Sequence, residues 1–528
     1  MMWKYLVLFI LLSISVHAQN YPQFNATVYD SSGTGYYFLV PIKMGPQGAN
    51  FNPYHMILDS VGNVVYYKEF VSGLNTGDFK LLSNGLMTYT YLNKYYLMDS
   101  SFTILDSVNC KNGIQHDGHD MQITANGEYL LMGSENVVMD LSSYYLFNNN
   151  GSPGSSTASV KAVVIQIQDV NKNVIFEWHS KDYFSFTDVD TARLNNPNTV
   201  DWTHSNAVAE DSDGNILLSS RHFNEITKIN RTTGDVMWRM GGNANQFNFL
   251  NDPGMFTGQH DCRRIANGNL TLFDNGAPGH PAAAKEYLLD EINLTAELVW
   301  SYVKDSTIFS LSTGNVQRLE NGNTLIDFGN LNVNISQPAF EVVDSMGQKV
   351  FEVTFADTLL SYRAFNFSSL PFQFLRPEIS CYEAGGIGYL DAGTTYPEYL
   401  WNTGETTQTI AISTTGEYSV FVPVGNAGNI SSVGFNVTDI GDPCNTLSSF
   451  AEQIDINSLE IFPNPGNGNF SISNYGQFDK YQLITSKGEI ISSGNLKEQH
   501  NFSEISAGIY FLHVQNINTT NTFRIIIR

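Results

Sequence analysis

The sequence DWTHSNAVAEDSDGNILLSSRHF occupies residues 201–223, and GQHDCRRIANGNLTLFDNG occupies residues 258–276. Each stretch contains a histidine that is followed, after an apolar strand pattern, by an Asp-Gly or Asn-Gly pair. Such pairs are the strongest short-range signal of a β-hairpin turn. The two stretches therefore predict two hairpins that each begin at a histidine.

The same pattern extends over residues 33–365, where two signatures alternate. One is an apolar strand, a turn and a second apolar strand, and it occurs six times. The other turns on Asn-Gly or Asp-Gly and occurs five times. The five turns are Asn84-Gly85, Asn126-Gly127, Asp213-Gly214, Asn267-Gly268 and Asn321-Gly322.

This alternation gives about four strands per roughly 40 to 60 residues, a spacing typical of propeller blades rather than of sandwich strands. We therefore predict an all-β chain in which residues 19–367 form a six-bladed β-propeller. Strands near Tyr36–Ile42 would replace the missing sixth hairpin and close the ring. The insertions at residues 136–159 and 181–200 are expected to be loops on one face, where binding residues commonly lie.

The two ends of the chain carry further signals. Lys4, the apolar run Tyr5–Val16 and the small-residue motif ending at Ala18 predict a secretory signal peptide over residues 1–18. No later run approaches the ~20 apolar residues of a membrane-spanning helix, so we expect no transmembrane segment. Short alternating strands predict two small β-sandwiches, the first of them immunoglobulin-like, at residues 378–445 and 457–528.

Charge and cysteine content limit the classes of partner. The net charge of -24 excludes nucleic acid, because its binding relies on Lys and Arg that neutralise phosphates. An anionic substrate would have to be captured by a local cationic pocket. Of the four cysteines, Cys381 and Cys444 flank a compact segment and are the best candidates for a disulfide, whereas Cys262 is expected to be a packing residue.

Three histidines occupy one repeated position. His119 and His260 each lie seven residues before the asparagine of their turn, and His204 lies nine residues before Asp213. A difference of two leaves strand alternation unchanged, so all three side chains point to the same face. Because the innermost strands of a propeller line a central channel, the three imidazoles are predicted to meet at one axial site.

Arg221 adds a cation to this site. It lies eight residues after Asp213, across the hairpin from His204, where cross-strand neighbours are about 4.5 to 5.5 Å apart at Cβ. The same offset after the other turns gives Ser134 and Asn275, which are both polar. We predict that these two residues contribute to substrate binding.

Two chemistries compete for such a site. Three imidazoles can hold Zn²⁺ with an open fourth position, which would suit a metal-dependent lyase or hydrolase. A guanidinium among them repels a metal cation and favours a tetrahedral oxyanion instead. We therefore expect anion chemistry without a metal or another cofactor. A third hypothesis, from a different class, is a non-catalytic propeller for surface binding or adhesion.

The motifs at these positions resemble those of the bacterial arylsulfate sulfotransferases. The matching runs are His119-Asp120, Asp201 to Asn206, Ser219 to His222, Gln259-His260-Asp261, Leu272 to Gly276 and Tyr362-Arg363-Ala364. The resemblance implies a six-bladed propeller that passes a sulfuryl group from a phenolic sulfate ester to a phenolic acceptor. It further implies a ping-pong mechanism through a sulfohistidine.

Within that resemblance each residue has an implied role. His260 would be the nucleophile, and His119, His204, Asn206 and Arg221 would hold the sulfuryl oxygens. In the fifth hairpin the chain has Ser312, Thr313 and Asn315 where a further cationic contact would be expected.

The last segment resembles the C-terminal sorting domain of type IX secretion. The resemblance rests on Leu459 to Pro465, Gly468 to Ile472, Ser486 to Glu489 and Gly508 to Leu512. It implies that the type IX secretion machinery carries the chain across the outer membrane, so that the protein is secreted or displayed on the cell surface.

Overall fold

The computed structural model describes most of the chain after residue 19. The described residues are 20–30, 35–44, 50–73, 76–145, 153–333, 338–356, 358–393, 396–444, 461–462, 468–472, 478–485, 490–497, 499–506, 508–515 and 520–527. The signal peptide predicted at residues 1–18 lies outside them. Within the described part the regular structure consists of β-strands and short 3₁₀ helices, which confirms the all-β prediction. No helix among these residues has the length and hydropathy that a membrane span requires.

Five sheets in the region predicted as a propeller each contain four strands that follow one another along the chain. Two of them consist of β5 (Thr76–Leu81), β6 (Met87–Tyr91), β7 (Lys94–Met98) and β8 (Ile104–Val108), and of β9 (Gln115–Ile123), β10 (Tyr129–Met139), β11 (Ala158–Gln168) and β12 (Val174–His179). Two more consist of β14 (Ser205–Glu210), β15 (Ile216–Ser220), β16 (Glu225–Ile229) and β17 (Val236–Gly241), and of β19 (His260–Arg264), β20 (Leu270–Asp274), β21 (Ala283–Asp290) and β22 (Thr295–Val303).

The fifth sheet consists of β23 (Asn315–Arg318), β24 (Thr324–Asp327), β25 (Pro338–Val343) and β26 (Lys349–Phe355), and β1 (Phe24–Val28) extends it. Two short strands add parallel pairs, β13 (Thr199–Asp201) to β11 and β18 (Asn248–Leu250) to β22. The 3₁₀ helices are η2 (Ser180–Asp182), η3 (Phe186–Asp188), η4 (Thr191–Arg193) and η5 (Arg221–Phe223). The first three fall in the region predicted as a loop at residues 181–200.

A sixth sheet joins strands from the two ends of this region. Its innermost strand is β27 (Leu360–Phe367), which pairs with β2 (Tyr36–Ile42), and β3 (Tyr54–Leu58) and β4 (Val64–Glu69) follow outward. Tyr36 lies opposite Phe367 in this pairing. The N-terminal strands near Tyr36–Ile42 thus complete a sheet with a strand that comes more than three hundred residues later.

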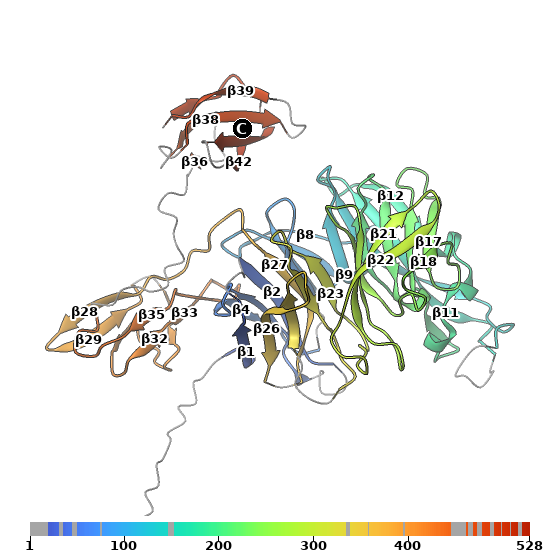
Figure 1. Ribbon diagram of the computed structural model, residues 1–528, viewed down its shortest axis with the longest axis horizontal. Helices are drawn as coiled ribbons and strands as arrows, with labels where there is room; N and C mark the ends of the chain where they lie inside the picture. The colour runs from blue at the N-terminus through green and yellow to red at the C-terminus, as the bar shows by residue number, and fades with distance from the viewer. Residues whose placement is uncertain are drawn as a thin grey trace, which may run out of the picture. The chain divides into compact units, whose positions relative to one another are not determined.

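The innermost strands of the six sheets pack against one another in a cyclic order. β27 contacts β5, β5 contacts β9, β9 contacts β14, β14 contacts β19, β19 contacts β23, and β23 contacts β27 again. Figure 1 shows β9, β23 and β27 gathered in the same part of the molecule although they are far apart in the sequence. Residues on these inner strands are therefore brought to one place.

The local sequence explains the hairpins. The glycine of each of the five predicted turns has a positive φ of 80° to 90°, which confirms the turn prediction. At Gly214 and Gly268 an added Cβ would meet nothing within 4 Å. Glycine is needed there for its backbone conformation and not for space.

Apolar side chains fill the spaces between neighbouring sheets. One core cluster joins Leu217 and Ile226 of the β14 sheet to Leu270 and Leu272 of the β19 sheet. Cys262 is buried in the same cluster, and burial raises the pKa of its thiol to about 12. This agrees with the prediction that Cys262 is a packing residue.

The segment predicted as an immunoglobulin-like sandwich divides its strands among different sheets. β28 (Ser380–Ala384), β29 (Ile387–Asp391) and β31 (Thr409–Ala411) form a sheet of their own. β30 (Leu400–Trp401), β33 (Val420–Pro423) and β34 (Asn429–Ser431) instead extend the sixth sheet, with Ile430 opposite Tyr66 of β4. The Ser431 hydroxyl also donates to the Val64 carbonyl at 2.6 Å, so this segment covers the outer edge of that sheet.

The remaining strands belong to a second compact unit, residues 414–417 and 433–528. It contains the pair β32 (Gly416–Tyr418) and β35 (Phe435–Val437), a sheet of β36 (Ile461–Phe462), β37 (Asn469–Ile472) and β40 (Gln499–Asn501), and a sheet of β38 (Lys480–Thr485), β39 (Ile490–Asn495), β41 (Gly508–Gln515) and β42 (Thr520–Ile527). Phe470, Leu483 and Leu512 are in its core. Of the cysteines, Cys110 and Cys262 are free and buried, whereas Cys381 and Cys444 are disulfide-bonded.

Candidate active site

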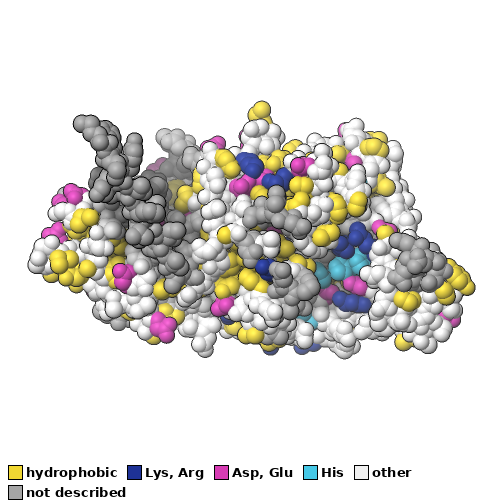
Figure 2. Space-filling model, turned by 90° about the horizontal axis from the view of Figure 1, so that it is seen from below, with side chains coloured by type: hydrophobic (Ala, Val, Ile, Leu, Met, Phe, Trp, Pro, Cys, Tyr) yellow, Lys and Arg dark blue, Asp and Glu magenta, His cyan; other side chains and the backbone are white. Residues whose placement is uncertain are grey.

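A pocket of about 710 Å³ contains the predicted cluster. His119, His204, His260 and Arg221 all line it. The lining also includes Lys43, Phe51, Asp117, Lys161, Leu311, Ser312, Thr313 and Tyr362. Figure 2 shows histidine side chains with basic and acidic side chains beside them in a hollow of this face. The structure therefore brings together four residues that span more than 140 positions of the sequence.

The inner strands place these four residues. His119 lies within β9, His260 begins β19, and His204 directly precedes β14. Arg221 follows β15, and its amide N–H donates to the His204 carbonyl at 3.2 Å. Because β9, β14 and β19 pack side by side, the imidazoles converge, and the ring centroids of His119 and His204 are 5.5 Å apart.

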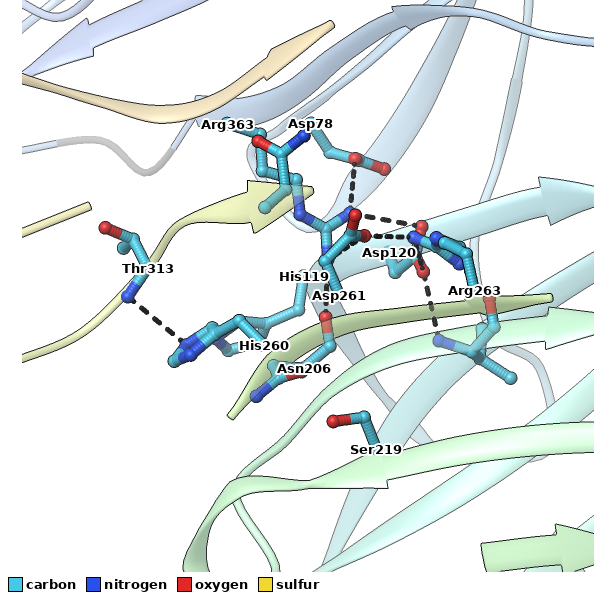
Figure 3. Close-up of polar contacts among 12 residues, drawn as sticks. Asp78, His119, Asp120, Asn206, Ser219, His260, Asp261, Arg263, Thr313 and Arg363 are labelled. Carbon is cyan, nitrogen blue, oxygen red and sulfur yellow. Dashed lines mark hydrogen bonds and ion pairs between the residues drawn. The ribbon is translucent and has the colours of Figure 1, made fainter. Parts of the chain in front are cut away.

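The hydrogen bonds of His260 fix the state of its ring. The backbone N–H of Thr313 donates to Nε2 at 3.2 Å, and an amide can only donate, so Nε2 carries no proton. Nδ1 carries the proton and donates to Asn275 Oδ1 at 2.7 Å. Burial, and then the charge of Arg221, hold the pKa of His260 well below its usual range. His260 is therefore a neutral imidazole with its Nε2 lone pair at the pocket wall (Figure 3).

His119 has the opposite character. Its Nδ1 forms a very short hydrogen bond with the Asp117 carboxylate, which also accepts its backbone N–H at 3.1 Å. Burial lowers the pKa of His119, but the charge and the hydrogen bond of Asp117 outweigh burial and raise it above the usual value. His119 is thus the imidazole of the cluster that most readily carries a proton.

His204 lies between these two cases. Its Nδ1 is 2.5 Å from Asp201 Oδ2, and its ring stacks on His222 with centroids 4.5 Å apart. Burial lowers the pKa of His204, and the Asp201 carboxylate offsets only part of that shift. The contact with Asp201 uses Nδ1, so Nε2 of His204 takes no part in it.

Arg221 is buried and only partly satisfied. Its Nη2 donates to the Leu311 carbonyl at 2.5 Å, while Nε has no hydrogen-bond partner among the described residues. The Ser312 hydroxyl beside it is also buried without a partner in the described part of the chain. Burial lowers the pKa of Arg221 to about 10, so the guanidinium stays charged near neutral pH. Unpaired buried donors of this kind fit a bound anion.

The other predicted binding residues lie outside the pocket lining. Asn275 is buried behind His260, where its Nδ2 also donates to the Thr313 carbonyl at 2.9 Å. Asn206 is buried and donates to the Gln259 carbonyl at 2.7 Å. Ser134 is buried on β10, paired with Gln115 of β9.

One group of described residues has the geometry of a metal site. It consists of Asp201, His204 and His222, whose ligand atoms lie within 4.8 Å of one another. Two of its nitrogens already have partners, because His204 Nδ1 bonds Asp201 Oδ2 and His222 Nδ1 donates to the Asp201 carbonyl at 2.6 Å. The Arg221 charge also lowers the pKa of both histidines. The nearby guanidinium therefore opposes any added cation at this group, a proton as well as a metal ion.

Sequence reasoning missed three residues of the site. Asp117 and Asp201 each precede a predicted histidine by two or three positions, and that spacing could have marked them as partners. Thr313 acts through its backbone N–H, which any residue type other than proline provides. No residue pattern could have singled it out for that contact.

Comparison with known proteins places the chain in a family. The family model described as arylsulfotransferase (ASST) matches residues 13–363, and the one described as secretion system C-terminal sorting domain matches residues 460–528. No curated protein matches the chain. A crystal structure of a protein of unknown function from Bacteroides caccae is 11% identical with a TM-score of 0.41, and covers 63% of this chain and 98% of that chain.

A second solved structure is a catalytically inactive virginiamycin B lyase from Staphylococcus aureus with quinupristin. It is 10% identical with a TM-score of 0.31, and covers 63% of this chain and 100% of that chain. The match to the sorting domain indicates that the chain is exported. Because the first family model spans residues 13–363 of 528, the chain belongs to the arylsulfotransferase family.

Proposed function

We propose that the protein transfers a sulfuryl group from a phenolic sulfate ester to a phenolic acceptor, in two half-reactions through a sulfohistidine at His260. The observation that carries this proposal is the unprotonated Nε2 of His260 in a pocket that also holds the Arg221 guanidinium and the imidazoles of His119 and His204. Membership of the arylsulfotransferase family supports the same reaction class.

The six four-stranded sheets are, in this proposal, the blades of a closed β-propeller. The cyclic contacts of their innermost strands support that architecture. The strands of residues 378–445 would then form a spacer that begins at the outer edge of the sixth sheet, next to β4. The pocket lies where the inner strands meet, so it is built from several blades at once.

In the first half-reaction Nε2 of His260 attacks the sulfur of the donor. The S–N bond forms as the S–O bond to the aryl group breaks, and the aryl oxygen leaves with that electron pair. His119, whose raised pKa favours its protonated form, gives a proton to the departing oxygen. Nδ1 of His260 keeps its proton. Asn275 Oδ1 accepts the hydrogen bond from this N–H and so stabilises the positive charge on the ring.

Charge on the sulfuryl oxygens is met by the donors around His260. Arg221 Nε–H has no partner among the described residues, and the Thr313 N–H, which must leave Nε2 as the S–N bond forms, can then donate to a sulfuryl oxygen. His204 completes the set from the adjacent strand. Sulfuryl transfer, like phosphoryl transfer, depends mainly on positioning and on such preorganised donors.

The second half-reaction reverses the first with a new phenol. The phenol oxygen attacks the sulfur, the S–N bond breaks, and His119, now neutral, takes the phenolic proton. His260 returns to its neutral form with the proton on Nδ1. One pocket can serve donor and acceptor because they bind in turn.

Mass spectrometry tests the covalent intermediate. After brief incubation with 4-nitrophenyl sulfate and no acceptor, the peptide that contains His260 is expected to gain ~80 Da, the mass of one sulfuryl group. His260→Ala should abolish both this gain and the release of 4-nitrophenol. His179→Ala is a matched control, because His179 lies outside the pocket lining and bonds Glu135 and Glu177. Turnover by His260→Ala at the wild-type rate would contradict the mechanism.

We also propose that the type IX secretion machinery reads the C-terminal domain and releases the protein to the cell surface or the medium. The match of residues 460–528 to the sorting domain supports this. A reporter fused to residues 459–528 should cross the outer membrane of a host that has this machinery. Retention of the fusion in the periplasm would refute the proposal.

A further inference from the structure

A buried set of charged residues lies next to the pocket histidines. It consists of Asp78, Lys80, Asp120, Asp261, Arg263 and Arg363, here called the inner charge network, and Figure 3 labels all of them except Lys80. Five of these side chains are at most 5% exposed, and Arg263 is 18% exposed. Three carboxylates face three cations, so the network is balanced without help from solvent.

Arg363 of β27 is the centre of this network. Its Nη1 is 3.0 Å from Asp78 and 3.4 Å from Asp120. Its Nη2 donates to the Asn206 carbonyl at 2.7 Å and lies 3.4 Å from Asp261. One guanidinium thereby contacts four other innermost strands, namely β5, β9, β14 and β19.

Three of these contacts fall directly beside the pocket histidines. Asp120 follows His119, Asp261 follows His260, and Asn206 lies two residues after His204. Each of these strands has a shift in pairing register at that point, between His116 and Met121 of β9, between Ser205 and Ala207 of β14, and between His260 and Arg263 of β19. β-Bulges of this kind re-aim side chains next to functional sites.

We propose that Arg363 is a positioning residue, which holds the three bulged strand segments so that their imidazoles meet in the pocket. It touches neither donor nor acceptor, and it acts through the residues that follow the histidines. Ion pairs from Arg263 to Asp120 and Asp261, both at 2.6 Å, link two of the same segments from the other side. The kinetic test of this inference rests on the proposed function, whereas its structural test does not.

Arginine suits this task for a geometric reason. Its planar fork can direct five N–H groups at several acceptors at once, whereas a lysine ammonium is a compact point charge. A lysine at position 363 would keep the balance of charge but could not reach Asp78, Asp261 and the Asn206 carbonyl together. The conservative substitution therefore separates the geometry of the network from its charge.

The test compares Arg363→Lys with Arg264→Met. Arg264 also lies on β19 and bonds Asp211 at 2.6 and 2.8 Å, but it contacts none of the segments beside the histidines. For 4-nitrophenyl sulfate we expect Arg363→Lys to lower kcat by about 10²-fold, the usual effect of a misplacement of about 1 Å, with a much smaller change in KM. The control should keep kcat within about twofold of wild type. Wild-type kcat in Arg363→Lys would overturn the proposal.

A crystal structure of Arg363→Lys gives an independent readout. The separation of 5.5 Å between the His119 and His204 rings and the contact of 3.2 Å from Thr313 N to His260 Nε2 should both change. Imidazoles in unchanged positions would overturn the proposal even if the wild-type protein transferred no sulfuryl group. If Arg363→Lys does not fold, Asp261→Asn removes one contact of the network at constant volume. Wild-type kcat in that variant would also count against Arg363.

Discussion

At His260, a backbone amide and a side-chain amide together decide which ring nitrogen carries no proton. Thr313 occupies Nε2 with a donor, and Asn275 holds the proton on Nδ1. The two are themselves joined, because Asn275 Nδ2 donates to the Thr313 carbonyl. The tautomer of His260, the proposed nucleophile, therefore depends on a small closed circuit of hydrogen bonds.

Asn275→Ala tests this circuit. Without Oδ1 the ring can rotate or take the other tautomer, so we expect kcat to fall by about 10²-fold. Steady-state release of 4-nitrophenol measures the change. Asn269→Ala is the control, since Asn269 bonds Glu286 at the far end of the same hairpin. Equal activity in both variants would remove Asn275 from this role.

Arg221→Lys tests the requirement for a guanidinium. Lysine keeps the positive charge but loses the Nε–H that has no partner in the described structure. We expect kcat to fall by about 10² to 10³-fold, the usual cost of one preorganised oxyanion donor. Wild-type kinetics in this variant would show that charge alone is sufficient.

The Asp117–His119 pair predicts a pH dependence. Its carboxylate raises the pKa of His119, so donor cleavage should decline as pH rises through that pKa, where His119 loses its proton. In Asp117→Asn the pKa of His119 falls and the decline should move to lower pH. The burst of 4-nitrophenol measured against pH checks this, and an unmoved alkaline limb would contradict it.

The same pair has a consequence for stability. The pKa of His119 is higher in the folded protein than the ordinary value of 6.5. The stabilisation that the pair provides is therefore complete below about pH 6.5 and is lost as pH rises through the folded pKa. The difference in Tm between wild type and Asp117→Asn should accordingly narrow at alkaline pH.

Among the elements, β4 pairs with a strand from outside residues 19–367, the region predicted as a propeller. Its outer edge pairs with β34 at Tyr66 and Tyr67. Unpaired strand edges invite association with other chains. The segment that ends in β34 thus covers an edge that the sixth sheet would otherwise expose.

Truncated chains test whether β34 protects the outer edge of β4. A chain that ends at residue 376 lacks β34, and we expect it to melt earlier and to self-associate in size-exclusion chromatography. Tm should drop by about 2 to 4 °C for each kcal/mol lost. A chain that ends at residue 445 keeps β34 and is the control. The same melting temperature and elution for both truncations would contradict this role.

The sequence predicted these elements unevenly. Turns at Gly214 and Gly268 were predictable because the local residues dictate a positive φ. The convergence of His119, His204 and His260 followed from strand alternation counted from those turns. The register shifts beside the same histidines were not predictable, because no local residue pattern marks them and the residue that contacts these segments, Arg363, is distant in the sequence. The placement of Asn206 and Ser134 outside the pocket lining reflects the same limit, since a bulge changes which side chains face inward.

For the whole molecule, the net charge and the local charge of the pocket have opposite signs. The chain carries -24, yet Lys43, Lys161 and Arg221 line the pocket with Asp117 as their acidic neighbour in the described lining. The proposed aryl sulfate donor would therefore be repelled at long range and attracted at short range. Electrostatics should therefore slow the approach of the donor without weakening its binding.

Salt dependence measures this balance. The Debye length shrinks from about 30 Å at 0.01 M to about 10 Å at 0.1 M, which screens the long-range repulsion first. We expect kcat/KM for 4-nitrophenyl sulfate to rise modestly over this range, while the value for a neutral phenol acceptor stays constant. A steep fall for the donor would show that local attraction dominates its approach.

The pairing of β27 with β2 determines when, during synthesis of the chain, the pocket can be completed. Both Tyr362, at the pocket wall, and Arg363, beside the histidines, are supplied by the last of the inner strands. A nascent chain cannot complete the pocket until residue 367 has left the ribosome. This holds even if the earlier sheets have already formed. A truncated translation product that ends before Leu360 lacks both residues, so the proposed activity would begin only after β27 has been made.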